Sequence, residues 1–325
     1  SPYTQYDQEV TQTAVDWLKQ RGQQQDRPFV LYVGLVAPHF PLIAPERFYD
    51  LYENQPIPQA KLHPTQGHQR HPWVEAYANF DYTEENFHDA QERERAFRAY
   101  WGLCSYLDHN VGRILQALTD SGLADDTTVV YTSDHGDNLG ARGLWGKSTL
   151  YEESARIPMI IAGPGIQPGV CDTPVDLLDL FPTILQCAGI DPAPEMQQRH
   201  GQSLTQTAAA PLQAERVILS EYHAAGSNTA AFMLRRGRYK YIHYVRHAPE
   251  LFDLQADPEE LNDLASDPAH VDVLKDLQAA LYEICDPEAM DALAKQDQQA
   301  MIEGYGGVEV AATMGAAGAT PAPEK

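Results

Sequence analysis

Apolar positions in the N-terminal part of the chain alternate between helical spacing and short continuous runs. Helical spacing predicts one helix over about residues 6–21 and a longer helix over about 90–121, each with a single apolar face. Residues 29–36, 127–132 and 157–162 instead form almost unbroken apolar runs of strand length. A strand that is apolar on both faces is typical of the centre of a parallel sheet covered by helices. This alternation predicts an α/β fold, in which a doubly wound, mainly parallel sheet carries helices on both faces.

The C-terminal part of the chain has a different pattern. Residues 216–222, 231–235 and 239–244 are short runs with strand character, and the last two are joined through a turn at Gly237. Such closely spaced runs predict a small antiparallel sheet. An acidic stretch with helical spacing follows this sheet.

These patterns divide the chain into three predicted parts. They are a large α/β domain over residues 1–205, a small α+β subdomain over residues 206–303, and a tail rich in Gly, Ala and Pro over residues 304–325. The tail has few side chains to pack, and disorder is its simplest interpretation. The alternative is that it folds over an active site, including that of a neighbouring subunit in a homo-oligomer.

Composition narrows the kinds of partner. The chain has 325 residues, with 46 acidic against 23 basic residues and a formal net charge of −23. A surface of this charge repels polyphosphate, so we expect no nucleic-acid partner. A small anionic substrate is still compatible, because a few local cations and a metal ion reverse the field inside one pocket. No run reaches membrane-spanning length and no signal peptide is recognised, so we expect no membrane partner and leave the compartment open.

Candidate chemistry lies in the segments that follow two of the predicted strands. Asp134 and His135 directly follow one apolar run, His39 follows another, and Lys147 lies in the loop before the third. A carboxylate and an imidazole at a strand end can share one divalent metal when other segments add ligands. An ammonium group in such a loop can stabilise an anionic group in transfer and its leaving oxygen. Taken singly, Asp134 and His135 are more simply a turn cap, Lys147 is more simply a solvated surface charge, and His39 is as readily a structural histidine. Their occurrence together favours a site.

Several short motifs occur in order over most of residues 29–264. They are Pro38-His39-x-Pro41, Ser133-Asp134-His135-Gly136, Gly146-Lys147, Tyr151-Glu-Glu-Ser-x-Arg156-Ile-Pro158, Val175-Asp176-Leu-x-Asp179-Leu-x-Pro182-Thr183, Arg235-Arg-Gly-Arg-Tyr-Lys-Tyr241 and Glu250-Leu-Phe-Asp253-Leu. Together they resemble the type I, formylglycine-dependent sulfatases of the alkaline phosphatase superfamily. The resemblance implies an alkaline-phosphatase-like fold and metal-dependent hydrolysis of a small-molecule sulfate monoester.

The resemblance also assigns roles to the candidate residues. Asp134 and His135 match the family's strand-end metal ligands, usually for one Ca²⁺, with Mg²⁺ or Mn²⁺ in some relatives. Lys147 matches the lysine that binds the sulfate group and stabilises the leaving oxygen. His39 matches the histidine that contacts sulfate and helps to protonate the leaving group.

The chain departs from the family pattern at the nucleophile. The family uses a formylglycine made from Cys in the sequence C-x-[PA]-x-R, and none of the four cysteines has that context; they are Cys104, Cys171, Cys187 and Cys285. We therefore expect an N-terminal segment of the same enzyme to supply the formylglycine and further metal ligands, as a partner of this chain. The chain by itself is then expected to be inactive.

Two further residues are candidate substrate contacts. His223 follows the run over 216–222, a region from which family members often bring a residue to the non-sulfate end of the substrate. Trp145 precedes Lys147 in its loop and can wall the pocket. A hydrogen-bonded surface histidine and a tryptophan packed under the loop are the alternatives. The acidic balance and His223 favour a small or cationic alcohol, such as a choline-type ester.

Two other functions are also compatible with the sequence. The first is a phosphonate or phosphate mono- or diesterase of the same superfamily, which uses similar metal and lysine positions. The second is a non-catalytic, sulfatase-like protein that binds anions. The identity of the nucleophile distinguishes them, because Cys in C-x-[PA]-x-R favours a sulfatase, whereas Thr or Ser favours phosphoryl transfer.

Overall fold

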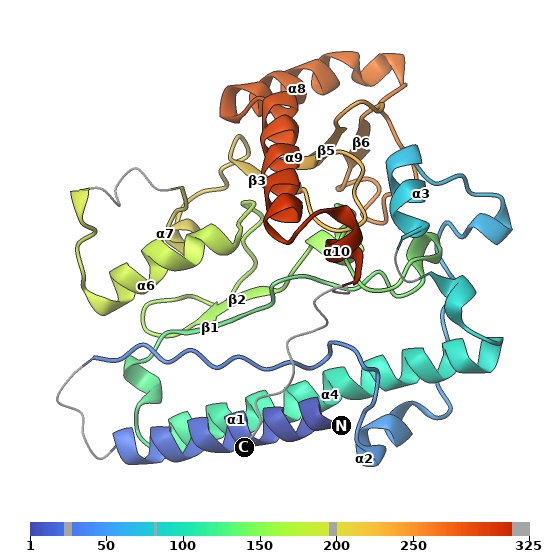
Figure 1. The fold of residues 1–325 in the computed structure, drawn as a ribbon. Helices are drawn as coiled ribbons and strands as arrows, with labels where there is room; N and C mark the ends of the chain where they lie inside the picture. Colours follow the sequence, from blue (N-terminus) through green and yellow to red (C-terminus); the bar gives the residue numbers. More distant parts are fainter. Residues whose placement is uncertain (23–27, 81–82, 195–199, 314–325) are drawn as a thin grey trace.

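A computed structural model describes residues 1–22, 28–80, 83–194 and 200–313. Figure 1 shows a helical layer, a central region with a two-stranded sheet, and a second region built on a four-stranded sheet. The helices are α1 (Pro2–Arg21), α2 (Glu46–Tyr49), α3 (Pro72–Ala78), α4 (Ala90–Asp120), α5 (Glu152–Ala155), α6 (Leu180–Ala188), α7 (Leu204–Ala209), α8 (Val271–Ile284), α9 (Pro287–Gly304) and α10 (Val308–Thr313). The strands are β1 (Val129–Thr132), β2 (Met159–Ala162), β3 (Val217–Tyr222), β4 (Ala231–Arg236), β5 (Tyr239–Tyr244) and β6 (Glu250–Asp253).

Helices α1 and α4 form the helical layer and lie side by side (Figure 1). Each begins at a side-chain cap: Ser1 accepts the backbone N–H of Thr4, and Asp89 accepts that of Glu92. Such caps satisfy backbone donors that have no partner within the helix. The apolar faces of the two helices meet at Val15, Leu18, Ala117 and Leu118, and Leu123, just beyond α4, belongs to the same cluster. The two long helices predicted from the apolar spacing are thus confirmed, apart from a few residues at their ends.

Strands β1 and β2 pair in antiparallel fashion, with Val129 opposite Ala162 and Thr132 opposite Met159. The α/β class is confirmed, but both sheets among the described residues are antiparallel, so the expected parallel pairing is not found in this part of the chain. Residues 29–36 also differ from expectation. They run extended without a described strand partner, and the side chain of Tyr32 is 89% exposed. An extended segment becomes a strand only when a neighbour accepts and donates its ladder hydrogen bonds.

The C-terminal sheet has the order β3-β4-β5-β6 with every pair antiparallel. This confirms the small antiparallel sheet and adds β6, which the apolar pattern did not predict. Successive residues of β4 face opposite sides of the sheet, as the strand period requires. Phe232 and Leu234 pack against α8, whereas Met233 packs in a cluster with Trp73 and Tyr77 of α3. That second cluster also contains Leu144 and Leu150, so the sheet supports the loop that carries Lys147.

The structure describes only part of the C-terminal tail predicted over residues 304–325. The predicted boundaries at 205/206 and 303/304 stay predictions. Residues 314–325 of the predicted tail lie outside the described residues, while residues 308–313 form α10. None of the helices in the described residues combines the length and the apolar character needed to cross a bilayer.

Candidate active site

His39 and Lys147 meet directly. The Nζ atom of Lys147 lies 2.8 Å from Nε2 of His39, and Nδ1 of His39 lies 2.7 Å from the carbonyl oxygen of Phe40. An ammonium group only donates, so Nε2 is the acceptor and Nδ1 carries the proton donated to Phe40. Burial lowers the pKa of His39, and the charge of Lys147 lowers it further. The pair is therefore a neutral imidazole that accepts a hydrogen bond from a cation.

The turn that carries His39 follows the extended segment over 28–36. The backbone N–H of His39 donates to the carbonyl of Val36 at 3.0 Å. Both X–Pro peptide bonds of the turn, Ala37–Pro38 and Phe40–Pro41, are cis. The ring of Phe40 lies 5.5 Å from Nζ of Lys147, within the range of a cation–π contact. The lysine thus contacts two side chains of this turn.

Asp134 and His135 occupy the end of β1, as predicted. The Oδ2 atom of Asp134 lies 3.5 Å from Nε2 of His135, and Nδ1 of His135 lies 2.8 Å from the carbonyl oxygen of Gly136. A proton on Nδ1, donated to that carbonyl, leaves Nε2 with its lone pair available to a metal. The rings of His135 and His39 have centroids 6.1 Å apart. The predicted metal-ligand pair and the predicted catalytic pair are therefore neighbours.

Gly136 sets the position of this strand end. A Cβ atom at residue 136 would lie 2.0 Å from the carbonyl oxygen of Glu153, a contact that real Cβ atoms essentially never make. The backbone N–H of Gly136 also donates to the carbonyl of Ser154 at 2.8 Å. Only glycine permits this close approach of two backbones. The approach fixes Asp134 and His135 relative to α5.

Asp137 closes the loop that carries Lys147. Its Oδ1 atom accepts the backbone N–H groups of Leu139 at 2.9 Å and Gly146 at 3.1 Å. The hydroxyl of Tyr77 donates to the carbonyl of Lys147 at 3.0 Å. Burial raises the pKa of Asp137 to about 6. No local sequence signal indicates this role of Asp137, because the contact that closes the loop joins residues nine positions apart.

Buried charged side chains connect the segments on both sides of Lys147 to the C-terminal sheet. The Nζ atom of Lys240, which has 0% side-chain exposure, lies 3.0 Å from Glu152 and 2.8 Å from Glu260. Arg142 donates to the carbonyl of Glu260 at 3.1 Å and forms an ion pair with Glu153 at 3.2 Å. Buried charges are stable only when they are paired in this way. The four-stranded sheet thereby anchors both ends of the Lys147 loop.

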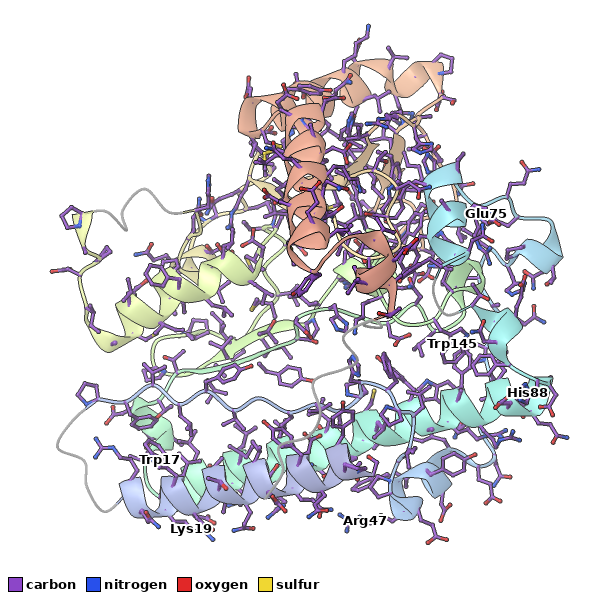
Figure 2. All side chains as sticks on the ribbon, in the orientation of Figure 1. Trp17, Lys19, Arg47, Glu75, His88 and Trp145 are labelled. Atoms are coloured by element: carbon purple, nitrogen blue, oxygen red, sulfur yellow. The ribbon has the colours of Figure 1, made fainter. Side chains whose placement is uncertain are left out.

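The two predicted substrate contacts have different surroundings. Trp145 is 6% exposed and packs edge to face against Phe87 and Phe97, and Figure 2 places it over the N-terminal part of α4. This burial favours packing under the loop over a direct substrate contact. His223 lies in the loop after β3, with Nε2 3.2 Å from Glu221 and its ring against Phe232. Within the part of the chain that the structure describes, no hydrogen bond or ring contact joins His223 to His39 or Lys147, so its substrate role stays a prediction.

The donor set at the end of β1 fits part of a metal site. Asp134 and His135 present an oxygen and a nitrogen close enough to face one ion. Within residues 1–22, 28–80, 83–194 and 200–313, no group of three His, Cys, Asp or Glu side chains is arranged to hold a metal. A complete coordination shell for Ca²⁺ needs about six to eight oxygen ligands. These two residues can hold a metal only together with ligands from outside the described groups.

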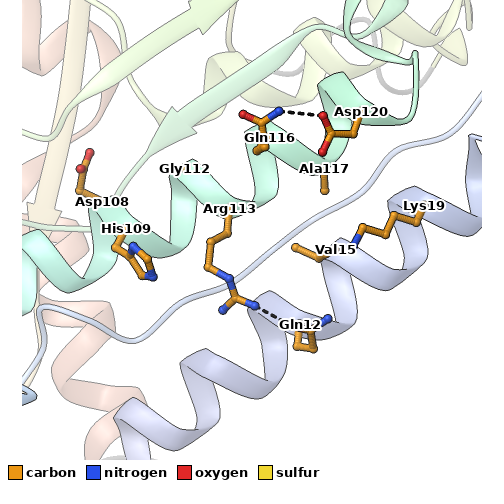
Figure 3. A pocket seen from close by; sticks show the side chains of 10 residues that line it. All are labelled: Gln12, Val15, Lys19, Asp108, His109, Gly112, Arg113, Gln116, Ala117 and Asp120. Atoms are coloured by element: carbon orange, nitrogen blue, oxygen red, sulfur yellow. Dashed lines mark hydrogen bonds between the residues drawn. The ribbon is translucent and has the colours of Figure 1, made fainter.

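A groove of about 510 Å³ lies elsewhere, between α1 and α4 (Figure 3). Its walls include Gln12, Lys19, Asp108, Arg113 and Asp120, and Arg113 donates to Gln12 at 2.6 Å. None of the six predicted site residues lines it. The groove is thus separate from the candidate active site.

Comparisons with protein families match the whole region of the site. The family described as Sulfatase matches residues 1–190, and the family described as N-sulphoglucosamine sulphohydrolase, C-terminal, matches residues 140–287. The choline-sulfatase of Rhizobium meliloti (strain 1021) is 37% identical over 310 residues, which cover 90% of this chain and 59% of that protein. The chain therefore spans about three fifths of the length of this relative.

Solved structures show the same architecture. The structure of BT4656 in complex with its substrate D-glucosamine-2-N,6-O-disulfate has a TM-score of 0.71 at 22% identity, covering 86% of this chain and 69% of that chain. At this level of identity the likeness concerns the fold. The phosphonate monoester hydrolase of Silicibacter pomeroyi has a TM-score of 0.63 at 29% identity, covering 76% of this chain and 53% of that chain. These likenesses confirm the alkaline-phosphatase-like fold predicted from the sequence motifs.

Proposed function

The chain belongs to the sulfatase family, and from this premise we propose that it is part of an enzyme that hydrolyses small-molecule sulfate monoesters. The observation that carries the proposal is the 2.8 Å contact between Lys147 and His39, next to the Asp134–His135 pair. A sulfate ester presents an anionic group and a leaving oxygen that gains charge as the S–O bond breaks. The site offers a cation, a hydrogen-bonding imidazole and a candidate metal-ligand pair at one place.

Each residue has a defined task in this proposal. The ammonium group of Lys147 binds the sulfate oxygens and stabilises the leaving oxygen electrostatically. His39 is neutral and its Nε2 accepts a hydrogen bond from Lys147, so a proton that reaches the leaving oxygen comes from the Lys147 ammonium group, directly or through the imidazole, and the lysine is then reprotonated from solvent. Asp137 and Tyr77 keep Lys147 in place through the loop backbone. The attack at sulfur itself is assigned to a group outside this chain.

We further propose that Asp134 and His135 bind one divalent metal, most simply Ca²⁺, with Mg²⁺ or Mn²⁺ as alternatives. When bound, such an ion neutralises negative charge on the substrate and on its attacking group. The support is the 3.5 Å approach of Asp134 Oδ2 to His135 Nε2, together with the Nδ1 contact that orients the ring. The remaining ligands are assigned to the partner segment proposed next.

The proposed nucleophile is a formylglycine in an N-terminal segment of the same enzyme, which pairs with this chain. Support comes from the apolar surface left open at the centre of the fold. Val30 is 63% exposed in the extended segment, and Ile160 is 58% exposed in the middle of β2. Apolar runs of this kind belong in a covered sheet, and an uncovered sheet edge favours aggregation. A segment that adds strands here would bury this surface.

For the substrate we propose a small sulfate ester with a neutral or cationic alcohol, of the choline type. The support is the net charge of −23 and the likeness to a protein described as choline-sulfatase. His223 is the candidate contact for the alcohol, because it directly follows Tyr222, the last residue of β3, whose ring lies 6.4 Å from that of Tyr77. Tyr77 in turn holds the carbonyl of Lys147.

Hydrolysis of a phosphonate or phosphate ester is the second candidate function. It is favoured by the likeness to a phosphonate monoester hydrolase at 29% identity. The same cation and metal-ligand pair would serve a phosphoryl group. The two functions are separated by assaying the full-length enzyme against matched sulfate and phosphonate monoesters of one phenol. A higher kcat/KM for the phosphonate would overturn the sulfatase proposal.

A further inference from the structure

A buried carboxylate in the helical layer contacts the turn that carries His39. Asp7 lies in the second turn of α1 and is 1% exposed. Its Oδ1 accepts the backbone N–H of Val36 at 2.7 Å, and its Oδ2 accepts that of Ala37 at 2.9 Å. Asp is a poor residue for a helix interior, and a buried carboxylate is costly unless it is hydrogen-bonded. Nothing in the packing of α1 on α4 requires a charge at this position, so the two long-range bonds call for an explanation.

The two bonds fix the first part of the His39 turn. Val36 donates its N–H to Asp7 and accepts the N–H of His39 through its carbonyl oxygen at 3.0 Å. Ala37, held by the other carboxylate oxygen, packs in a cluster with Phe48, Leu103 and Tyr106. The peptide groups that carry the N–H of Val36 and the N–H of Ala37 are therefore both oriented by one side chain of α1.

The contact between His39 and Lys147 tolerates little movement of the turn that carries His39. A hydrogen bond weakens steeply once the donor and acceptor move beyond about 3.2 Å or out of line. The Nζ–Nε2 distance of 2.8 Å between Lys147 and His39 depends on where the turn begins. We propose that Asp7 is a positioning residue for the active site, which fixes the backbone just before His39 and so holds its imidazole against Lys147. This inference rests on the proposed function, in which His39 assists the leaving group.

The test uses the full-length enzyme with Asp7→Asn. Asparagine has nearly the same size but one acceptor oxygen, so one of the two backbone N–H groups loses its partner. The control is Thr11→Val, a nearly isosteric change one helical turn further along α1 at a buried residue whose hydroxyl has no partner within the described structure. Asp7→Glu is the second variant, because it keeps the charge and both acceptors but displaces them by one methylene group.

The readout is the dependence of kcat on the leaving group across a series of aryl sulfates. If Asp7 positions His39, kcat of Asp7→Asn falls roughly 10-fold for poor leaving groups and little for good ones, with KM nearly unchanged. The double variant with His39→Ala then equals His39→Ala alone, because the two changes remove the same function. A uniform loss for all leaving groups, or a loss that adds to that of His39→Ala, would overturn the inference.

A second readout does not depend on turnover. The His39 ring signals in a histidine-labelled NMR spectrum, assigned with His39→Gln, should move in Asp7→Asn and Asp7→Glu but not in Thr11→Val. If the wild-type enzyme releases no sulfate, the proposed function fails, and these signals alone decide the role of Asp7. Unmoved His39 signals in both Asp7 variants would overturn it.

Discussion

Lys147 and His39 are separated by 108 positions in the chain, yet Nζ of the lysine lies 2.8 Å from Nε2 of the histidine. The contact joins a loop supported by the four-stranded sheet to a turn held by the helical layer. It gives each residue a protonation state, a charged lysine and a neutral histidine, that suits transfer of an anionic group. Several measurable consequences depend on this contact and on the groups around it.

Replacement of Lys147 tests the anion-binding role. In the full-length enzyme, Lys147→Ala is expected to lower kcat for a sulfate monoester by about 10²–10³-fold, the usual loss when one electrostatic stabiliser of a transition state is removed. Lys19→Ala is the control, because Lys19 is an exposed lysine in the groove of Figure 3. Steady-state kinetics of both variants check this. Equal kcat values for Lys147→Ala and the wild type would contradict the assigned role.

Metal removal tests the Asp134–His135 pair. A chelator should abolish sulfate release by the full-length enzyme, and added Ca²⁺, Mg²⁺ or Mn²⁺ should restore it. His135→Ala should lower the metal content measured by elemental analysis, because one of the proposed ligands is lost. The matched change His88→Ala, at an exposed histidine labelled in Figure 2, should leave the metal content unchanged. Full metal content in His135→Ala would exclude that residue as a ligand.

The sequence predicted the long helices and most of the four-stranded sheet better than it predicted the sheet formed by β1 and β2. Local patterns were sufficient for α1, α4 and strands β3, β4 and β5, since their apolar spacing is contained within each element. The sequence around Asp134 and His135 was likewise informative by itself, because these residues follow an apolar run of strand length. The strand predicted over residues 29–36 was wrong, because an apolar run indicates a buried strand but cannot show which neighbour pairs with it. The described residues provide no such neighbour.

The supporting contacts of the site were not predictable. Asp7, Asp137 and Tyr77 act through hydrogen bonds to backbone groups distant in the sequence, and such bonds leave no local signature. Trp145 shows the same limit. Its position before Lys147 is compatible with a pocket wall or with packing, and its contacts with Phe87 and Phe97 favour packing.

Gly136→Ala tests the close approach at the end of β1. The added Cβ atom would lie 2.0 Å from the carbonyl oxygen of Glu153, so one backbone must move. We expect the free energy of unfolding to fall by about 1–3 kcal/mol. Gly112→Ala in α4 is the control, because no atom lies within 4 Å of the added group and alanine favours the helix. Denaturant unfolding of both variants measures the difference, and an unchanged stability in Gly136→Ala would contradict the structure there.

The pH dependence of stability tests the buried carboxyl of Glu250, which accepts hydrogen bonds from the hydroxyls of Tyr151 and Tyr244. Burial raises the pKa of this group from 4.5 to about 7. The folded state therefore holds the proton more tightly than the unfolded state, so this group lowers the free energy of unfolding as pH rises from about 4.5 to about 7. The contribution is about 3 kcal/mol and is complete above pH 7.

Glu250→Gln removes this ionisation. Between pH 4.5 and 7, the free energy of unfolding of Glu250→Gln should therefore fall less than that of the wild type. The control is Glu309→Gln, at an exposed carboxylate of α10, which should keep the pH profile of the wild type. Urea unfolding at several pH values gives the comparison. Identical pH profiles for the wild type and Glu250→Gln would show that Glu250 titrates normally in the folded state.

In the function proposed here, this chain supplies the sulfate-binding half of a sulfatase, and another segment supplies the nucleophile. The direct measurement is sulfate release from a sulfate monoester by three samples at equal concentration: the 325-residue chain alone, the full-length enzyme, and the full-length enzyme with Lys147→Ala. We predict release by the unmodified full-length enzyme, release about 10²–10³-fold slower by the Lys147→Ala enzyme, and none by the 325-residue chain alone. Release by the chain alone at the full-length rate, or undiminished release by Lys147→Ala, would contradict the account.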